Sequence, residues 1–196
     1  MIIEISEISQ MQYEKFLRFK MIGSANSVFN IHFPDIIDMD TETIRIWMSN
    51  INAFPIYFCI QITDSFTRDF EFTCNTNSVK FKYIGEYDGS KIAIFEILDS
   101  ESFSVIFPFI NLISSMEDLV FWSIKKNCFT VDKMRRQRGV FDLIPVNINF
   151  DVETTVFSLT QSGLMLEVYS NSSLFNSYQD VVISLPDFLI PIELKE

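Results

Sequence analysis

Side chains able to do acid–base, nucleophilic or metal chemistry are scarce in this 196-residue chain. His32 is its single histidine, and Cys59, Cys74 and Cys128 are unclustered, without a CxxC spacing. A Cys–His pair could form only through His32, and nothing in the sequence around it supports such a pair. A zinc site takes about four His or Cys ligands, which one histidine and three scattered cysteines serve poorly.

The surroundings of His32 predict a structural position rather than a catalytic one. In the alternating stretch 28–33, Phe29, Ile31 and Phe33 share one face, while Asn30 and His32 share the other. A half-buried strand keeps its apolar face inside. We therefore expect His32 to face solvent from a strand rather than to act as a base.

Paired carboxylates are the remaining chemical candidates. Glu117-Asp118 or Asp38 with Asp40 could bind a cation, but adjacent carboxylates in an acidic chain are usually solvated surface or helix caps. With five glycines, the chain shows neither a G-x-S-x-G elbow nor a phosphate-binding glycine loop. The sequence predicts a protein that is not an enzyme, with no catalytic residue, no cofactor and no metal.

The charge balance limits the classes of partner. The chain has 26 acidic and 15 basic residues, which gives a formal net charge of −11. Such a protein is repelled by nucleic acid unless its basic residues gather on one surface. Without that gathering, its natural partner is a basic protein.

The basic residues lie mainly in two short stretches. The candidates for nucleic-acid contact are Lys15, Arg18, Lys20, Lys133, Arg135, Arg136 and Arg138. On a first helix, Lys15 and Arg18 would face outward, opposite the apolar arc, and Lys20 would have to snorkel out of that arc. The cluster 133–138 suits phosphate contact, and it equally suits a solvated loop that balances local acidity.

Hydrophobic periodicity predicts few helices and many strands. Helices are expected from Ser9 to Gly23, from Thr41 to Phe54-Pro55, and over 99–113, where Pro108 suits a helix that starts near Phe107. Strands are expected over 2–5, 28–33, 56–62, 66–74, 79–84, 91–97, 119–124, 128–131, 140–144, 154–160, 164–169 and 180–185.

An internal repeat organises these elements. Displacing the chain by about 92 residues lays Ile2-Ile3-Glu4-Ile5 over Ile94-Phe95-Glu96-Ile97, and Val28-Phe29 over Val120-Phe121. In both copies the same number of residues separates the first strand from the next, and a helix is expected between them. The sequence predicts a strand-rich α+β, clamp-like fold with few helices and two similar halves, 1–90 and 91–196, each opening strand–helix–strand.

Targeting signals are not evident. No apolar run reaches the ~20 residues of a membrane-spanning helix, and the first ten residues lack the basic and apolar regions of a signal peptide. Three unpaired cysteines suit a reducing compartment. We expect a cytoplasmic protein that does not enter a membrane, or one in a nuclear or viral replication compartment if the host is eukaryotic.

The repeated strand–helix–strand opening, the acidity and the outward basic residues of an early helix together resemble the DNA sliding clamps. The stretch 103–131 is similar to a clamp helix with its next two strands, and the tail 187–196 resembles the aromatic–Leu–x–Pro terminus of eukaryotic clamps. The helix of the second half, 99–113, has no Lys or Arg, unlike helices that line a DNA channel.

This resemblance implies a processivity factor. Copies of the chain would close into a ring, most simply a trimer, around duplex DNA without sequence specificity and tether a polymerase or other factor. The partner would dock near the tail, at Phe188, Leu189, Ile190 and Pro191.

Other classes of function remain open. An acidic immunity protein or antitoxin that blocks a basic toxin or nuclease has the same acidity and lack of catalytic residues. A viral or phage structural subunit would explain abundant hydrophobic interfaces. An enzyme with an unfamiliar carboxylate site is the last alternative.

Overall fold

The computed structural model describes residues 1–9, 13, 17, 19–34, 40–116, 119–132, 145–160 and 164–194. In chain order the elements are β1 (Ile2–Glu7), β2 (Lys20–Ile22), β3 (Ser27–His32), α2 (Thr41–Asn50), β4 (Ile56–Ile62), α3 (Asp64–Thr76), β5 (Phe81–Tyr87), β6 (Ser90–Ile97), α4 (Ser100–Ser115), β7 (Val120–Ser123), β8 (Phe129–Val131), β9 (Val146–Asn149), β10 (Thr155–Thr160), β11 (Met165–Ser170), the short 3-10 helix η2 (Ser173–Phe175), α5 (Tyr178–Ser184) and β12 (Ile190–Glu193).

Nine strands form one continuous sheet in the order β12-β1-β3-β11-β10-β7-β4-β6-β5. The β1–β12 pair is parallel, and every other neighbouring pair is antiparallel. A smaller sheet has the order β2-β9-β8. The strand-rich α+β class predicted from the sequence is confirmed.

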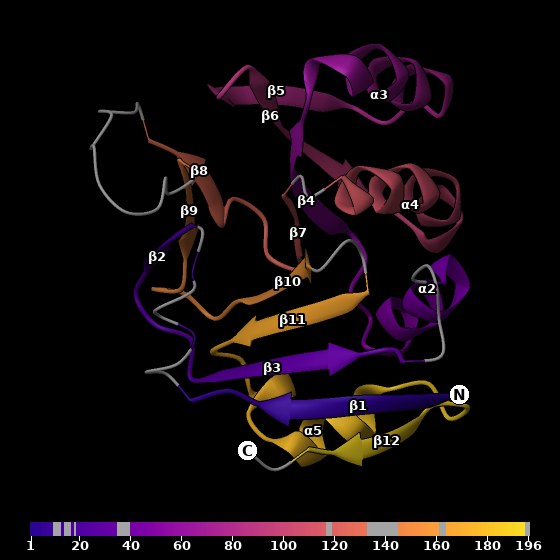
Figure 1. Ribbon diagram of the computed structural model, residues 1–196, viewed down its shortest axis with the longest axis vertical. Coiled ribbons are helices and arrows are strands. Elements are labelled where there is room, and N and C mark those ends of the chain that lie inside the picture. Colours follow the sequence, from indigo (N-terminus) through magenta and orange to yellow (C-terminus); the bar gives the residue numbers. More distant parts are fainter. Residues whose placement is uncertain are drawn as a thin grey trace.

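Each face of the large sheet covers a separate hydrophobic core. Helices α2, α3 and α4 lie along one face, on the right of Figure 1, and the small sheet lies on the left. The helix-side core includes Trp47, Phe103 and Trp122, and the core toward the small sheet includes Phe121 and Phe129. Strands covered on both faces are almost wholly apolar, which explains the aromatic content of the chain.

The small sheet approaches the large one closely at Gly85 of β5. A Cβ added to Gly85 would lie 2.6 Å from Cγ1 of Val131 in β8. The missing side chain is therefore what lets β8 pack against β5.

Helix α2 forms where the sequence places it, but its cap is one residue earlier. Asp40, rather than the predicted Thr41, is the N-cap, and its carboxylate accepts hydrogen bonds from the backbone N–H groups of Glu42 and Thr43. Ile44 and Trp47 on its inner face are fully buried in the helix-side core.

Two predicted strands, 66–74 and 180–185, are wrong, because both segments are helices. In α3 the aromatic and sulfur residues fall on even positions, which suits a strand, but Phe66, Phe70 and Cys74 are also four residues apart. Phe72 also falls on an even position, yet it is 72% exposed. The spacing of four residues, and not of two, therefore describes which of these side chains are buried. Strand β12 lies in the tail, where no strand was predicted, and β9 was likewise not predicted.

Two helix boundaries also differ from the prediction. Helix α4 begins at Ser100, so Pro108 lies inside it rather than in its first turn. Residues 20–22 form strand β2, so the expected helix over 9–23 does not extend to Gly23. The strand expected over 140–144 lies outside the described residues.

The two predicted halves share one sheet. Strands from 1–90 and from 91–196 are interspersed along it, and β6 begins at the boundary itself. The 92-residue displacement aligns β1 with β6 and β3 with β7. β1 and β3 are neighbours, whereas β4 lies between β6 and β7. The halves as separate units stay a prediction.

Candidate protein-binding surfaces

Helix α4 presents an apolar stripe to solvent. One side of this helix is buried, with Phe103, Phe107 and Ile110 in the helix-side core. On the opposite side, the exposed Glu101 is followed at intervals of three or four residues by Val105, Pro108, Leu112 and Met116, which are also exposed. We call these last four residues the α4 stripe. Val105, Leu112 and Met116 are 48% to 58% exposed, although a helix that is apolar all round is normally covered.

Acidic residues surround the α4 stripe. Helices α2 and α3 flank α4, as Figure 1 shows. Residues 40–50, 64–76 and 99–116 contain seven acidic and two basic side chains, a net charge of −5. Among the described side chains of this layer, the one ion pair is Glu42 with Arg45. The helical layer therefore attracts positive charge.

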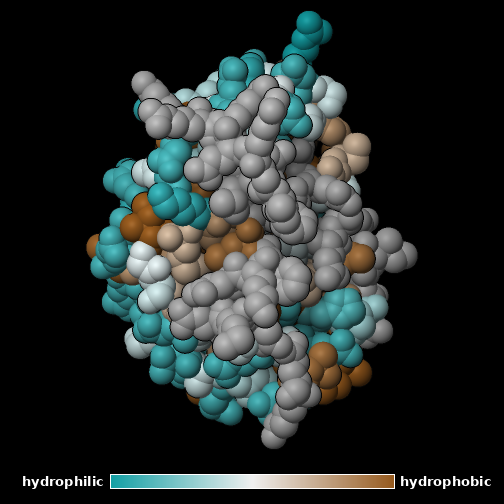
Figure 2. Space-filling view, turned by 60° about the vertical axis from the view of Figure 1, so that its left-hand side comes forward, coloured by the Kyte–Doolittle hydropathy of each residue, from teal (hydrophilic) through white to brown (hydrophobic). Residues whose placement is uncertain are grey.

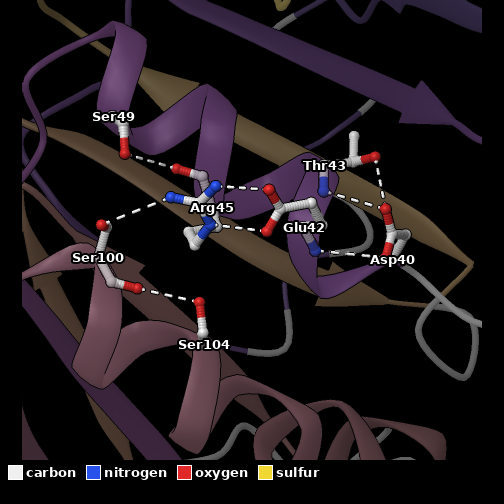
Figure 3. A network of polar contacts seen from close by, with 7 residues as sticks. All are labelled: Asp40, Glu42, Thr43, Arg45, Ser49, Ser100 and Ser104. Carbon is white, nitrogen blue, oxygen red and sulfur yellow. Dashed lines mark hydrogen bonds and ion pairs between the residues drawn. The ribbon is translucent and has the colours of Figure 1, made fainter.

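Two acids near the start of α4, Glu42 and Asp99, are held in their charged form. Arg45 donates from Nε to Glu42 at 2.7 Å, and this hydrogen bond lowers the pKa of Glu42. Asp99, the N-cap of α4, accepts from the backbone N–H of Ser102 at 2.8 Å, and this lowers the pKa of Asp99. Figure 3 shows Arg45 reaching from α2 to Ser100, at the first residue of α4.

A second apolar surface lies at the β12 end of the large sheet. Ile3 and Ile5 of β1 point into the helix-side core, so Ile2 points to the other face. The pairing of β1 with β12 places Ile190 beside Ile2 and Ile192 beside Glu4. We call Ile2, Ile190, Ile192 and Leu194 the β1–β12 patch. These four side chains are 41% to 59% exposed.

The residues predicted to bind a partner all lie beside or within this end of the sheet. Phe188 and Ile190 are exposed, whereas Leu189 is buried and Pro191 is intermediate. Leu189 therefore serves the core. The amino group of Met1 donates to the carbonyl of Phe188 at 3.1 Å, which ties the N-terminus to this segment.

Both edges of the large sheet carry features that hinder pairing with another strand. In β12, the N–H of Ile190 donates to Met1 and the N–H of Leu194 to Ile5, so position 191 faces outward. Pro191 has no N–H to offer there. At the other edge, β5 has an irregular register between Tyr83 and Gly85 and an exposed Lys82. Bulges, lysines and prolines are common protections of edge strands.

His32 lies where the sequence predicted, on a strand face and partly exposed. Its Nδ1 is 3.1 Å from Oε2 of Glu4 on the adjacent strand. On the next strand, the Tyr169 hydroxyl donates to Glu167 at 2.7 Å, while burial raises the pKa of Glu167. In the described ranges, no three His, Cys, Asp or Glu side chains are grouped so that they could hold a metal.

The cysteines are positioned as core residues. All three are buried and form no disulfide. Burial raises the pKa of all three thiols, to about 12 for Cys74 and about 11 for Cys128. A thiol is a weak nucleophile until it ionises, so these three side chains are unreactive at neutral pH.

Of the predicted nucleic-acid-binding residues, the structure describes Lys20 alone. It lies in β2 rather than in a helix, and its ammonium is 3.8 Å from the carboxylate of Asp132. The other six lie outside the described residues: Lys15, Arg18, Lys133, Arg135, Arg136 and Arg138. Figure 2 views the side of the molecule that carries the small sheet, where small hydrophobic areas lie among hydrophilic ones.

The α4 stripe was not predicted from the sequence, because both sides of this helix are apolar. Positions 105, 108, 112 and 116 lie on one side of a helical wheel, opposite 103, 107 and 110.

Among the described elements, no helix combines the length and apolarity needed to cross a membrane. No protein-family model, curated protein or solved structure matches the chain.

Proposed function

We propose that the protein is a non-enzymatic acidic binding protein that covers the functional surface of a basic protein, as an immunity protein or antitoxin does. The observation that carries this proposal is the α4 stripe, an exposed apolar helix side within a helical layer of net charge −5. Apolar contacts surrounded by polar residues are the usual anatomy of a protein interface.

The two features of this surface have separate physical roles. The acids attract a positively charged partner over distances of about 10 Å and speed association. The α4 stripe then loses its contact with water, which supplies most of the free energy of binding. Carboxylates on such a surface stand in for the phosphates that a basic nuclease would otherwise bind.

The sliding clamp, with its ring, its DNA contact and its polymerase partner, stays a prediction. A helical layer that faces DNA needs an excess of Lys and Arg, whereas the described helices have the opposite balance. For this reason the proposal rests on an acidic surface that binds protein.

The direct test measures binding of a basic amphipathic helix. The probe is a synthetic Leu/Lys peptide of about 18 residues, long enough to form a helix, and calorimetry gives its affinity. Replacing Val105 and Leu112 by Asn should weaken binding at least about tenfold, because both lose apolar contact without any change of charge.

Matched controls separate the α4 stripe from general acidity. Phe72→Asn with Ile183→Asn makes the same change at exposed apolar positions on α3 and α5, and it should leave the affinity unchanged. A Leu/Glu peptide should not bind. Equal weakening by both double variants, or tight binding of the Leu/Glu peptide, would overturn the proposal.

The natural partner can then be sought by chemistry. A basic protein encoded by a neighbouring gene should form a 1:1 complex with the wild-type chain. The Val105→Asn, Leu112→Asn variant should lose that complex while retaining its helical circular dichroism. A complex that survives this double substitution would place the partner elsewhere on the molecule.

A further inference from the structure

The β1–β12 patch differs from the α4 stripe in the charges beside it. The pairing register places Glu4 on the same face as the patch, and its carboxylate lies 3.1 Å from the ring of His32. Glu193 pairs with Ile5, and paired residues point to the same face of a sheet. The side chain of Ile5 lies in the helix-side core, so Glu193 points to the helix side and away from the patch. Among the described residues, the acid nearest to the patch on its own face is therefore a single carboxylate, which contacts the ring of His32.

A surface of this kind can face a copy of itself. A two-fold dimer joins the same surface of both subunits, so any uncompensated charge on it meets its own like. The α4 stripe fails this requirement, because its surrounding layer has a net charge of −5. The β1–β12 patch comes much closer to it, because its aliphatic side chains border one carboxylate, which contacts the His32 ring, instead of a layer with five excess negative charges.

The form of contact follows from the edge of the sheet. Pro191 and the four-residue length of β12 disfavour the addition of another strand beside it. The exposed side chains instead point perpendicular to the sheet, from the face opposite to α2, α3 and α4. Two such faces pack with their side chains interdigitated, about 10 Å apart.

We propose that two copies of this chain associate face to face through the β1–β12 patch in a two-fold dimer. This association is independent of the binding of a basic partner, because it uses the opposite face of the sheet from the α4 stripe. The dimer leaves both copies of the α4 stripe exposed.

The test is the mass in solution across a wide range of concentration. Sedimentation should show the 22.9 kDa monomer at low concentration and twice that mass at high concentration. Ile190→Asp should weaken the dimer at least about tenfold, because two buried carboxylates would face each other near the symmetry axis. Leu194→Asp, beyond the last residue of β12, should act in the same way without disturbing the strand.

The control is Ile183→Asp, an equal change at a side chain of α5 that is 73% exposed. This variant should dimerise like the wild type. A wild-type chain that remains a monomer at every concentration would overturn the inference, as would dimers of unchanged strength in both Ile190→Asp and Leu194→Asp. A trimer would also overturn it and would favour the ring of a sliding clamp.

Discussion

The α4 stripe and the β1–β12 patch are both exposed and aliphatic, but they differ in electrical surroundings. The stripe lies in a layer with five more negative than positive charges, whereas the patch borders the Glu4–His32 pair. An apolar surface supplies affinity for almost any apolar partner, and nearby charge decides which partner can approach. The same kind of side chain can thus serve two different partners on one molecule.

The backbone contributes a second difference. In α4 the peptide groups are largely satisfied within the helix, so side chains alone meet a partner. In β12 alternate peptide groups face outward, and a strand of another chain could pair with them. Pro191 removes one of these donors. The patch is thereby directed toward side-chain contact, as the stripe is.

Salt should separate the two surfaces most strongly. Raising ionic strength from about 0.05 M to about 0.5 M should weaken binding of the Leu/Lys peptide roughly tenfold, because it screens the acids around α4. The same change should strengthen the dimer, because it screens the repulsion between two chains of net charge −11. Calorimetry and sedimentation at both salt concentrations measure the two effects. A parallel response of the two associations would remove the contrast.

Pro108→Ala should stabilise the helix that carries the stripe. Pro108 lies inside α4, where it lacks the N–H that would donate to Ser104. The substitution should raise the free energy of unfolding by about 1–3 kcal/mol, measured by thermal or denaturant unfolding. The mass distribution of the dimer should not change, since β12 lies at one end of the large sheet, whereas α4 contacts β6, β7 and β10. An unchanged unfolding midpoint would show that α4 already accommodates the proline.

Asp40→Ala should destabilise the neighbouring helix α2. Asp40 caps this helix through two backbone N–H groups, and it also accepts from the hydroxyl of Thr43 at 2.9 Å. Loss of the cap should cost about 1 kcal/mol and lower Tm by roughly 2–4 °C. Asp40→Asn is the matched control, since Asn caps nearly as well. Equal losses in both variants would assign the effect to charge rather than to capping.

Glu167→Gln, on β11, should give the smallest effect. Burial raises the pKa of Glu167 in the folded chain, partly offset by the Tyr169 hydrogen bond, so folding favours the protonated form. Stability should therefore fall as pH rises from the ordinary carboxyl pKa through the raised one. Glu167→Gln should remove this fall and raise Tm at neutral pH but not at pH 3. A Glu167→Gln variant whose Tm depends on pH in the same way as that of the wild type would contradict this assignment.

Local patterns predicted most strands and two helices of the fold. The alternation around Phe29 and Ile31 marked β3, and the spacing of Ile44, Trp47 and Met48 marked α2. The pattern failed at α3 because residues spaced by four also fall on even positions, so period two and period 3.6 agree over short segments. Burial decides between them, and burial is a property of the whole fold.

The candidate site was predicted only in part. Phe188 and Ile190 were expected at a partner surface and are exposed, whereas Leu189 packs inward and Pro191 faces the outer edge of β12. The α4 stripe was not predicted, because a helix that is apolar on all sides does not reveal which side its neighbours cover. Six of the seven basic candidates lie outside the described residues, and their role stays a prediction.

By itself the sequence determined the composition-level features of this protein: its acidity, its surplus of aromatic residues for two cores, and its shortage of histidine and clustered cysteine. The tertiary structure alone decided which apolar residues remain in contact with water. The reason is physical. Helix and strand patterns follow from local spacing, whereas the exposure of Leu112 or Ile190 depends on which distant segments pack over these side chains. The contrast between a stripe in an acidic layer and a patch beside a single carboxylate exists only in the folded chain.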